Sequence, residues 1–117
     1  MPTDTVTVLS IVFIVSGLAL GGLAWAARTG RLKYNHWVGI RTAAVMRSER
    51  AWLAGHRSAA PMMFLAALGP VVGGALLPFL SGGTVTVVAL ISVLWVLVLL
   101  ALGAGRASTD AQAHQPD

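Results

Sequence analysis

Three long apolar stretches alternate with short polar segments along this chain. Residues 6–27, 59–80 and 84–104 contain no ionisable side chain. As helices rising about 1.5 Å per residue, each would cover about 32 Å, enough to cross a hydrocarbon core of roughly 30 Å. The pattern predicts an all-α membrane protein, with three transmembrane helices over these ranges in one domain of residues 1–105.

The composition supports lipid as the solvent. Charged residues make up 10% of the chain, whereas a soluble domain carries about 25%. The first apolar stretch could instead be a cleaved signal peptide, because Ala24-Trp25-Ala26 resembles a small-x-small cleavage site. The residues before that stretch include no lysine or arginine, and the stretch is longer than such segments usually are, so we expect a retained helix.

The basic residues indicate the orientation. The N-terminus and the turn at residues 81–83 have none. Lysine and arginine near the ends of spans are retained inside, which places the N-terminus outside and the C-terminus inside. We therefore expect a multi-pass protein of the cell membrane, with residues 28–58 in the cytoplasm. Seven of the eight basic residues lie in that segment: Arg28, Arg31, Lys33, Arg41, Arg47, Arg50 and Arg57.

The polar segments suggest two further features. From residue 106 to 117 the chain is polar and poor in hydrophobic residues, which predicts a disordered cytoplasmic tail. In the basic segment, Thr42 is a candidate N-cap for a short helix from Ala43 to about His56. Residues spaced by four, three and four would share one stripe of that amphipathic helix, which we expect at the membrane surface: Val45, Glu49, Trp52 and His56.

The basic segment can be interpreted in two ways. In the first, it only anchors the protein, with arginines binding anionic lipid headgroups at the inner leaflet and Trp37 and Trp52 at headgroup depth. In the second, Glu49, the only acidic residue between residues 5 and 109, pairs with Arg41 through bidentate hydrogen bonds. Asn35 and His56 could complete that polar cluster. The clustered charge is explained by topology, so no nucleic acid partner is expected.

Small residues mark candidate helix contacts, since paired glycines let backbones approach closely. One G-x-x-x-G pair lies in the first span and one in the second: Gly17 with Gly21, and Gly69 with Gly73.

Little in the chain indicates catalysis. His36 and His56 have only Glu49 as a further credible ligand, so neither a metal site nor a cofactor is expected. No nucleophile–base pair or carboxylate pair appears, which argues against an enzyme. The apolar stretches contain no ionisable group of the kind that ion-coupled carriers use, so transport is unsupported.

The basic segment contains a spaced motif of Asn35, Trp37, Gly39, Arg41, Thr42, Glu49, Trp52 and His56. This motif resembles the signature of the SdpI family. That signature is an asparagine, a short gap, Gly-Ile/Leu-Arg-Thr, about ten residues to a tryptophan, and a histidine four further on. The family's proline after Arg-Thr is replaced here by Ala43-Ala44. The resemblance covers roughly residues 30–61.

The resemblance implies a function. The family's founding member protects its cell against a membrane-active peptide toxin and is implicated in holding a repressor at the membrane, although it is a longer protein with additional spans. This chain is therefore expected to be a non-enzymatic immunity or sensing protein of a bacterial plasma membrane. Its partners would be a peptide toxin or a soluble regulator. The alternative is a small accessory subunit of a larger membrane complex, such as an envelope-lipid enzyme or an exporter.

Overall fold

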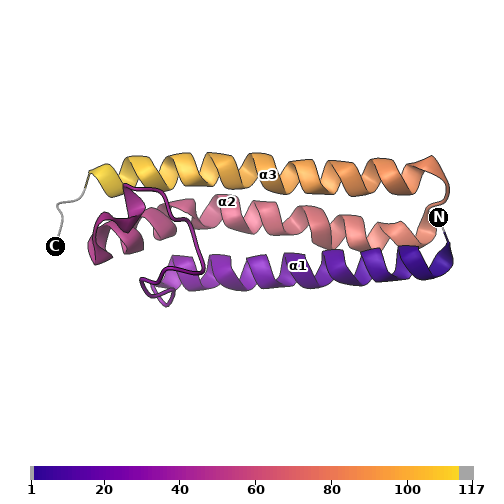
Figure 1. Cartoon of the computed structure of the whole chain (residues 1–117), viewed down its shortest axis with the longest axis horizontal. Coiled ribbons are helices and arrows are strands. Elements are labelled where there is room, and N and C mark those ends of the chain that lie inside the picture. Colours follow the sequence, from indigo (N-terminus) through magenta and orange to yellow (C-terminus); the bar gives the residue numbers. More distant parts are fainter. Residues whose placement is uncertain (1, 114–117) are drawn as a thin grey trace.

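The computed structural model describes residues 2–113, which form an elongated bundle of 53 × 20 × 19 Å. Helix α2 lies between the other two long helices and packs along both of them (Figure 1). The described residues contain helices and connecting segments only. The elements in chain order are α1 (Thr3–Thr29), the 3-10 turn η1 (Val45–Arg47), α2 (Glu49–Leu76), the 3-10 turn η2 (Leu77–Phe79) and α3 (Gly83–Gln112).

All three long helices are long and apolar enough to cross a membrane. Large apolar side chains such as Leu18 and Leu90 are 64% exposed, which suits a surface that faces lipid rather than water. The prediction of an all-α membrane protein with three spans is therefore confirmed. The expected orientation stays a prediction.

The start of α2 differs from the expected one. Ser48 has an extended backbone (φ −159°, ψ 168°), and its hydroxyl accepts a hydrogen bond from the Ala51 N–H at 3.0 Å. The helix predicted from Ala43 to His56 is therefore wrong: only the short turn η1 precedes Ser48, and the first turns of α2 follow it. The break at Ser48 lets Val45 turn inward, where it is fully buried. The burial of Val45 and the cap at Ser48 together favour a helix that starts after Ser48 over one that starts after Thr42.

The end of α3 also differs. The helix continues to Gln112, so residues 106–112, which we expected in a disordered tail, are helical. Ala107 and Ala111 are fully buried, and Ala107 approaches Gly55 of α2 closely. The contact with α2 explains why this polar segment is ordered. Residues 114–117 of the expected tail lie outside the described residues.

The predicted glycine pairs lie where the helices meet. A Cβ on Gly17 would come within 2.8 Å of the Ala67 carbonyl oxygen of α2, whereas one on Gly21 would be in ordinary contact with the Ala67 Cβ at 3.8 Å. On the other side of α2, Gly69 lies against Trp95 and Gly73 against Ser92 of α3. The glycine pair of α1 thus faces α2, and the glycine pair of α2 faces α3.

Gly17 provides a test of the contact between α1 and α2. Gly17→Ala should lower the free energy of unfolding by about 1–3 kcal/mol, because the added methyl would meet backbone that cannot move easily. Gly22→Ala is the matched control, since no atom lies within 4 Å of its added Cβ. Denaturant unfolding in mild detergent measures both variants. Equal effects would show that the close approach at Gly17 contributes nothing.

Candidate functional site

The connecting loop, residues 31–44, folds back over the first turns of α2 (Figure 1). It follows Gly30, which ends α1 in the left-handed conformation (φ 74°). Trp52 of α2 is fully buried under the loop, and its Nε1–H donates to the Leu32 carbonyl at 2.8 Å. The Tyr34 ring lies 5.3 Å from the Trp52 ring, and its hydroxyl donates to the Met46 carbonyl at 2.8 Å. Trp52, which we expected at headgroup depth, is the centre of a protein core, so its ring is not available to lipid headgroups.

His56 holds the loop by its imidazole ring. Nε2 lies 2.8 Å from the Ile40 backbone nitrogen, whose N–H can only donate, so Nε2 is the acceptor and carries no proton. Nδ1, 2.9 Å from the Trp52 carbonyl, must then carry the hydrogen and donate it. His56 is 1% exposed, and both ring nitrogens are satisfied. It is therefore a neutral structural histidine in this arrangement.

Gly39 lets the loop reach His56. Its φ of +117° is a conformation that residues with a side chain rarely adopt. A Cβ there would lie 2.6 Å from His56 Nε2 and 3.1 Å from the Trp52 ring. Both the backbone conformation and the available space therefore require glycine.

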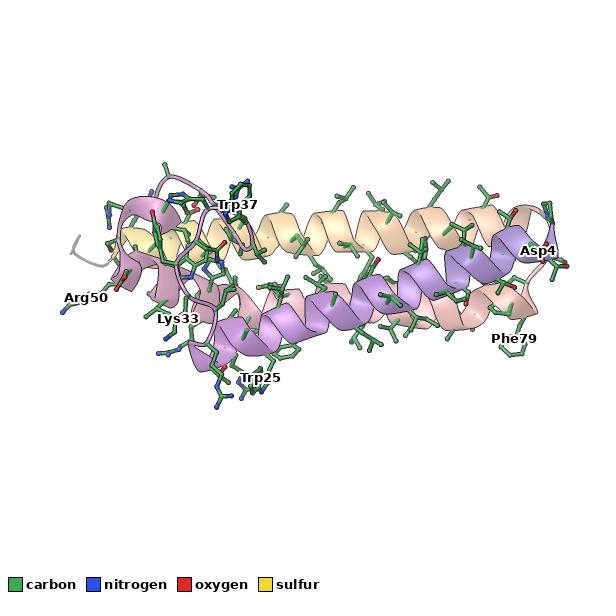
Figure 2. All side chains as sticks on the ribbon, turned by 60° about the horizontal axis from the view of Figure 1, so that its bottom comes forward. Asp4, Trp25, Lys33, Trp37, Arg50 and Phe79 are labelled. Carbon is green, nitrogen blue, oxygen red and sulfur yellow. The ribbon has the colours of Figure 1, made fainter. Side chains whose placement is uncertain are left out.

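Asn35 shapes the tip of the loop. Its Oδ1 accepts from the backbone N–H groups of Trp37 and Val38 at 2.8 and 2.7 Å. Its Nδ2 donates to the carbonyls of Lys33 and Val38 at 2.8 and 3.1 Å. These four bonds fix a tight turn whose most prominent side chain is Trp37, which is 86% exposed (Figure 2).

The expected ion pair between Arg41 and Glu49 is not formed. The Arg41 guanidinium donates instead to the His36 carbonyl, which the turn at Asn35 brings within reach. Glu49 lies in the first turn of α2, where a carboxylate is favourable beside the helix N-terminus. A backbone acceptor within the loop has thus replaced the predicted carboxylate.

Hydrogen bonds connect the basic segment to α3. The hydroxyls of Thr42 and Ser108 lie 2.8 Å apart, and Arg47 Nη2 donates to the Ala111 carbonyl at 2.8 Å. We call the residues that fasten the connecting loop the latch, and they contact both α2 and α3. The latch comprises Asn35, Gly39, Ile40, Thr42, Trp52, His56 and Ser108.

The sequence pattern gave no indication of several of these contacts. Ile40 and Leu32 act through backbone groups, which carry no signal in the residue type. Ser108 lies in the segment expected to be disordered. As for metals, no three histidine, cysteine or acidic side chains within residues 2–113 come together as a ligand group.

A family model described as the SdpI/YfhL protein family matches residues 31–103. The match covers more than half of the chain, including the connecting loop, α2 and most of α3. The chain belongs to the SdpI family. The searches for similar curated proteins and similar solved structures found no match.

In this SdpI-family protein, the matched range contains every latch residue except Ser108. The latch uses His56 and Trp52 for internal hydrogen bonds, so neither is available to a ligand. Arg41 and Trp37 remain exposed on the loop. The arrangement is suited to present a cation and an aromatic ring from a fixed backbone.

Proposed function

We propose that this SdpI-family protein is a non-enzymatic cell-membrane protein that protects the cell against, or senses, a membrane-active peptide. The partner, a peptide or a soluble regulator, would contact the basic connecting loop on the cytoplasmic side. Family membership supports the class of function, and the charge distribution supports the orientation. The observation that carries the proposal is the exposed Trp37, held on a turn with four hydrogen bonds.

A fixed loop suits recognition for a physical reason. Binding is weakened when it must order a flexible segment, because the ordering costs conformational entropy. A segment that is already held in place avoids that cost. Tryptophan and arginine are also the residue types that most often dominate binding energy at interfaces. The loop combines both, with Trp37 at its tip and Arg41 four residues further on.

The proposal is tested in cells that lack the gene. Such cells should be more sensitive to membrane-active peptides than the parent strain, and a plasmid copy of the gene should restore resistance. Unchanged sensitivity across peptides and envelope stresses, with no soluble partner co-purifying from native membranes, would rule the proposal out.

Two exposed aromatic residues provide matched variants. Trp37 and Phe79 are 86% and 85% exposed and lie at opposite ends of the molecule (Figure 2). Trp37→Ala should lose protection while remaining folded, since its ring is almost entirely outside the core, whereas Phe79→Ala should protect as the wild type does. Loss of protection in Phe79→Ala alone would place the interaction at the other end and contradict the proposed site.

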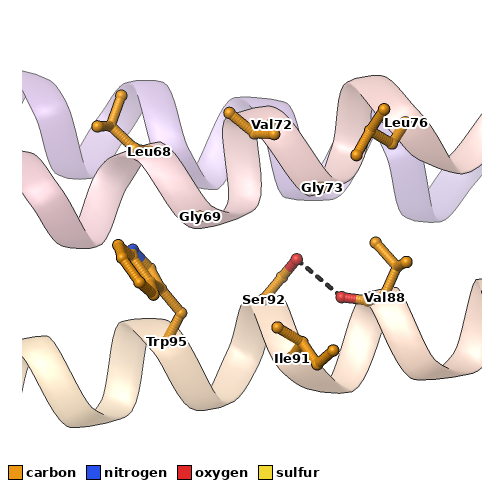
Figure 3. A pocket seen from close by; sticks show the side chains of 9 residues that line it. All are labelled: Leu68, Gly69, Val72, Gly73, Leu76, Val88, Ile91, Ser92 and Trp95. Atoms are coloured by element: carbon orange, nitrogen blue, oxygen red, sulfur yellow. Dashed lines mark hydrogen bonds between the residues drawn. The ribbon is translucent and has the colours of Figure 1, made fainter.

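A separate observation favours an accessory-subunit role as a second candidate. A cavity of about 380 Å³ lies between α2 and α3 and is lined by apolar side chains and two glycines (Figure 3). The Trp95 Nε1–H donates to the Leu65 carbonyl at 2.7 Å and Ser92 to the Val88 carbonyl at 2.9 Å, so its polar groups are satisfied. Small residues such as Gly69 and Gly73 are typical of contacts between transmembrane helices.

Crosslinking tests that second candidate. Val72→Cys places a thiol in the cavity wall, and Val98→Cys places one on an exposed position that does not line this cavity. A subunit role predicts that Val72→Cys alone captures a different membrane protein in mild detergent. Recovery of a monomer or a homo-oligomer only would exclude that role.

A further inference from the structure

A groove runs between α1 and α3 on one side of the bundle. Both helices pack along α2 and make little contact with each other, so α2 forms the floor. Near the connecting loop, a cavity of about 420 Å³ is lined by Leu23 of α1, Leu100 of α3 and Met63 of α2. Deeper in the bundle, a cavity of about 250 Å³ extends along Val12 and Leu97, and both cavities share Leu20. We call the two cavities together the α1–α3 groove.

The length of this groove corresponds to one leaflet. From Val12 to Leu23 the α1 wall rises about 17 Å at ~1.5 Å per residue. Half of a hydrocarbon core of roughly 30 Å is about 15 Å. On α3 the lining runs from Ser92 to Ala104, the loop-side half of the expected span 84–104, whereas Val12 on α1 lies just beyond the middle of the span 6–27. With the orientation that the basic residues favour, most of the groove therefore lies in the cytoplasmic leaflet.

The two ends of the groove differ in chemistry. Its walls are almost entirely apolar along the membrane-embedded part, with Ser16 and Ser92 as the exceptions. At the loop end it is closed by Gly39, Ile40, Arg41 and Thr42. The Arg41 guanidinium has five N–H groups, and within residues 2–113 it donates only to the His36 carbonyl. An apolar channel that ends at an exposed arginine matches an acyl chain that ends at a phosphate.

We propose that the α1–α3 groove binds an anionic phospholipid of the cytoplasmic leaflet, with one acyl chain along the groove and the phosphate at Arg41. Anionic lipids are concentrated in that leaflet and are attracted to basic segments beside it. The site shares Arg41 with the proposed partner surface, but lipid retention requires only the membrane in which the protein lies and can be measured without any partner.

A transmembrane helix of another protein fits the groove poorly. A helix with its side chains is at least about 10 Å across and must run through the whole membrane. The segment from Gly39 to Thr42 closes the loop end of the groove, where a crossing helix would have to continue. The groove therefore suits a chain thinner than a helix.

Lipid retention tests whether the charge of Arg41 at the loop end of the groove selects an anionic lipid. The purified protein is equilibrated with mixed micelles of equal phosphatidylglycerol and phosphatidylcholine, and native mass spectrometry counts the lipids that stay bound. We expect one retained phosphatidylglycerol per chain, and Arg41→Gln should reduce the preference over phosphatidylcholine about fivefold. Arg28→Gln removes the same charge from the end of α1 but does not line the groove, so it should keep the preference.

A second pair of variants tests the groove itself. Ala104→Phe places a ring in the cavity under the loop, whereas Ala101→Phe adds the same ring at an exposed position that does not line it. Only Ala104→Phe should abolish lipid retention, and thermal unfolding verifies that both variants are folded. Equal retention of both lipids by the wild type, or unchanged retention in Arg41→Gln and Ala104→Phe, would overturn the proposal.

Discussion

Replacing Trp52 by alanine should lower the free energy of unfolding by about 3–5 kcal/mol, as truncation of a fully buried tryptophan does. The side chain is 0% exposed and contacts the rings of Tyr34 and His56, at centroid distances of 5.3 and 4.2 Å. Its removal also leaves the Leu32 carbonyl without its donor. We therefore expect the connecting loop to detach from α2 before the three helices separate.

The matched control for this variant is Trp37→Ala. Trp37 lies in the connecting loop that covers Trp52 but is 86% exposed, so its removal should change the free energy of unfolding by about 0.5 kcal/mol at most. Denaturant unfolding in detergent gives both values, and hydrogen exchange of the Ile40 amide reports the loop separately. A loss in Trp52→Ala as small as that in Trp37→Ala would show that the latch does not stabilise the fold.

The three spans could be predicted from the sequence because the pattern that encodes them is local. An uncharged apolar stretch of about 20 residues requires a lipid solvent wherever it occurs, and a helix is the form that satisfies its backbone. Neither inference depends on which residues the helix contacts. The same reasoning gives no information on the paths of polar segments.

The two wrong helix boundaries, the start of α2 and the end of α3, lie where tertiary contacts determine the boundary. Thr42 and Ser48 are both good N-caps, and only the burial of Val45 against the bundle favours the second. At the other end, polar composition concealed a stripe of small residues spaced by four, which lies buried along α3: Gly103, Ala107 and Ala111. That spacing was a detectable signal, since small residues at intervals of four mark close helix contacts in membranes.

The site could be predicted by residue type but not by pairing. The motif indicated which side chains gather at the loop, and the structure places Asn35, Gly39 and His56 in one network. The partner predicted for Arg41 was wrong, because the actual acceptor is the His36 carbonyl. Every residue carries a carbonyl, so the residue type does not indicate this bond. Most latch bonds join a side chain to backbone, so complementary charges give no guide to them.

Gly39→Ala should lower the free energy of unfolding by about 2–4 kcal/mol, for two separable reasons. The φ of +117° strains any residue with a Cβ, and the Cβ would also lie 2.6 Å from His56 Nε2. The ring cannot retreat without losing its hydrogen bond from the Ile40 N–H. We therefore expect strain, a clash and a lost bond together.

Two other glycines separate these contributions. Gly82 also has a positive φ, of 59°, but a Cβ there meets no atom within 4 Å, so Gly82→Ala measures backbone strain alone. Gly105 has neither constraint and lies inside α3, so Gly105→Ala should be neutral or stabilising by up to about 1 kcal/mol. If Gly39→Ala lowers the free energy of unfolding no more than Gly82→Ala does, the clash with His56 adds nothing to the backbone strain. A larger loss, accompanied by faster exchange of the Ile40 amide, assigns the excess to the contact between the loop and α2.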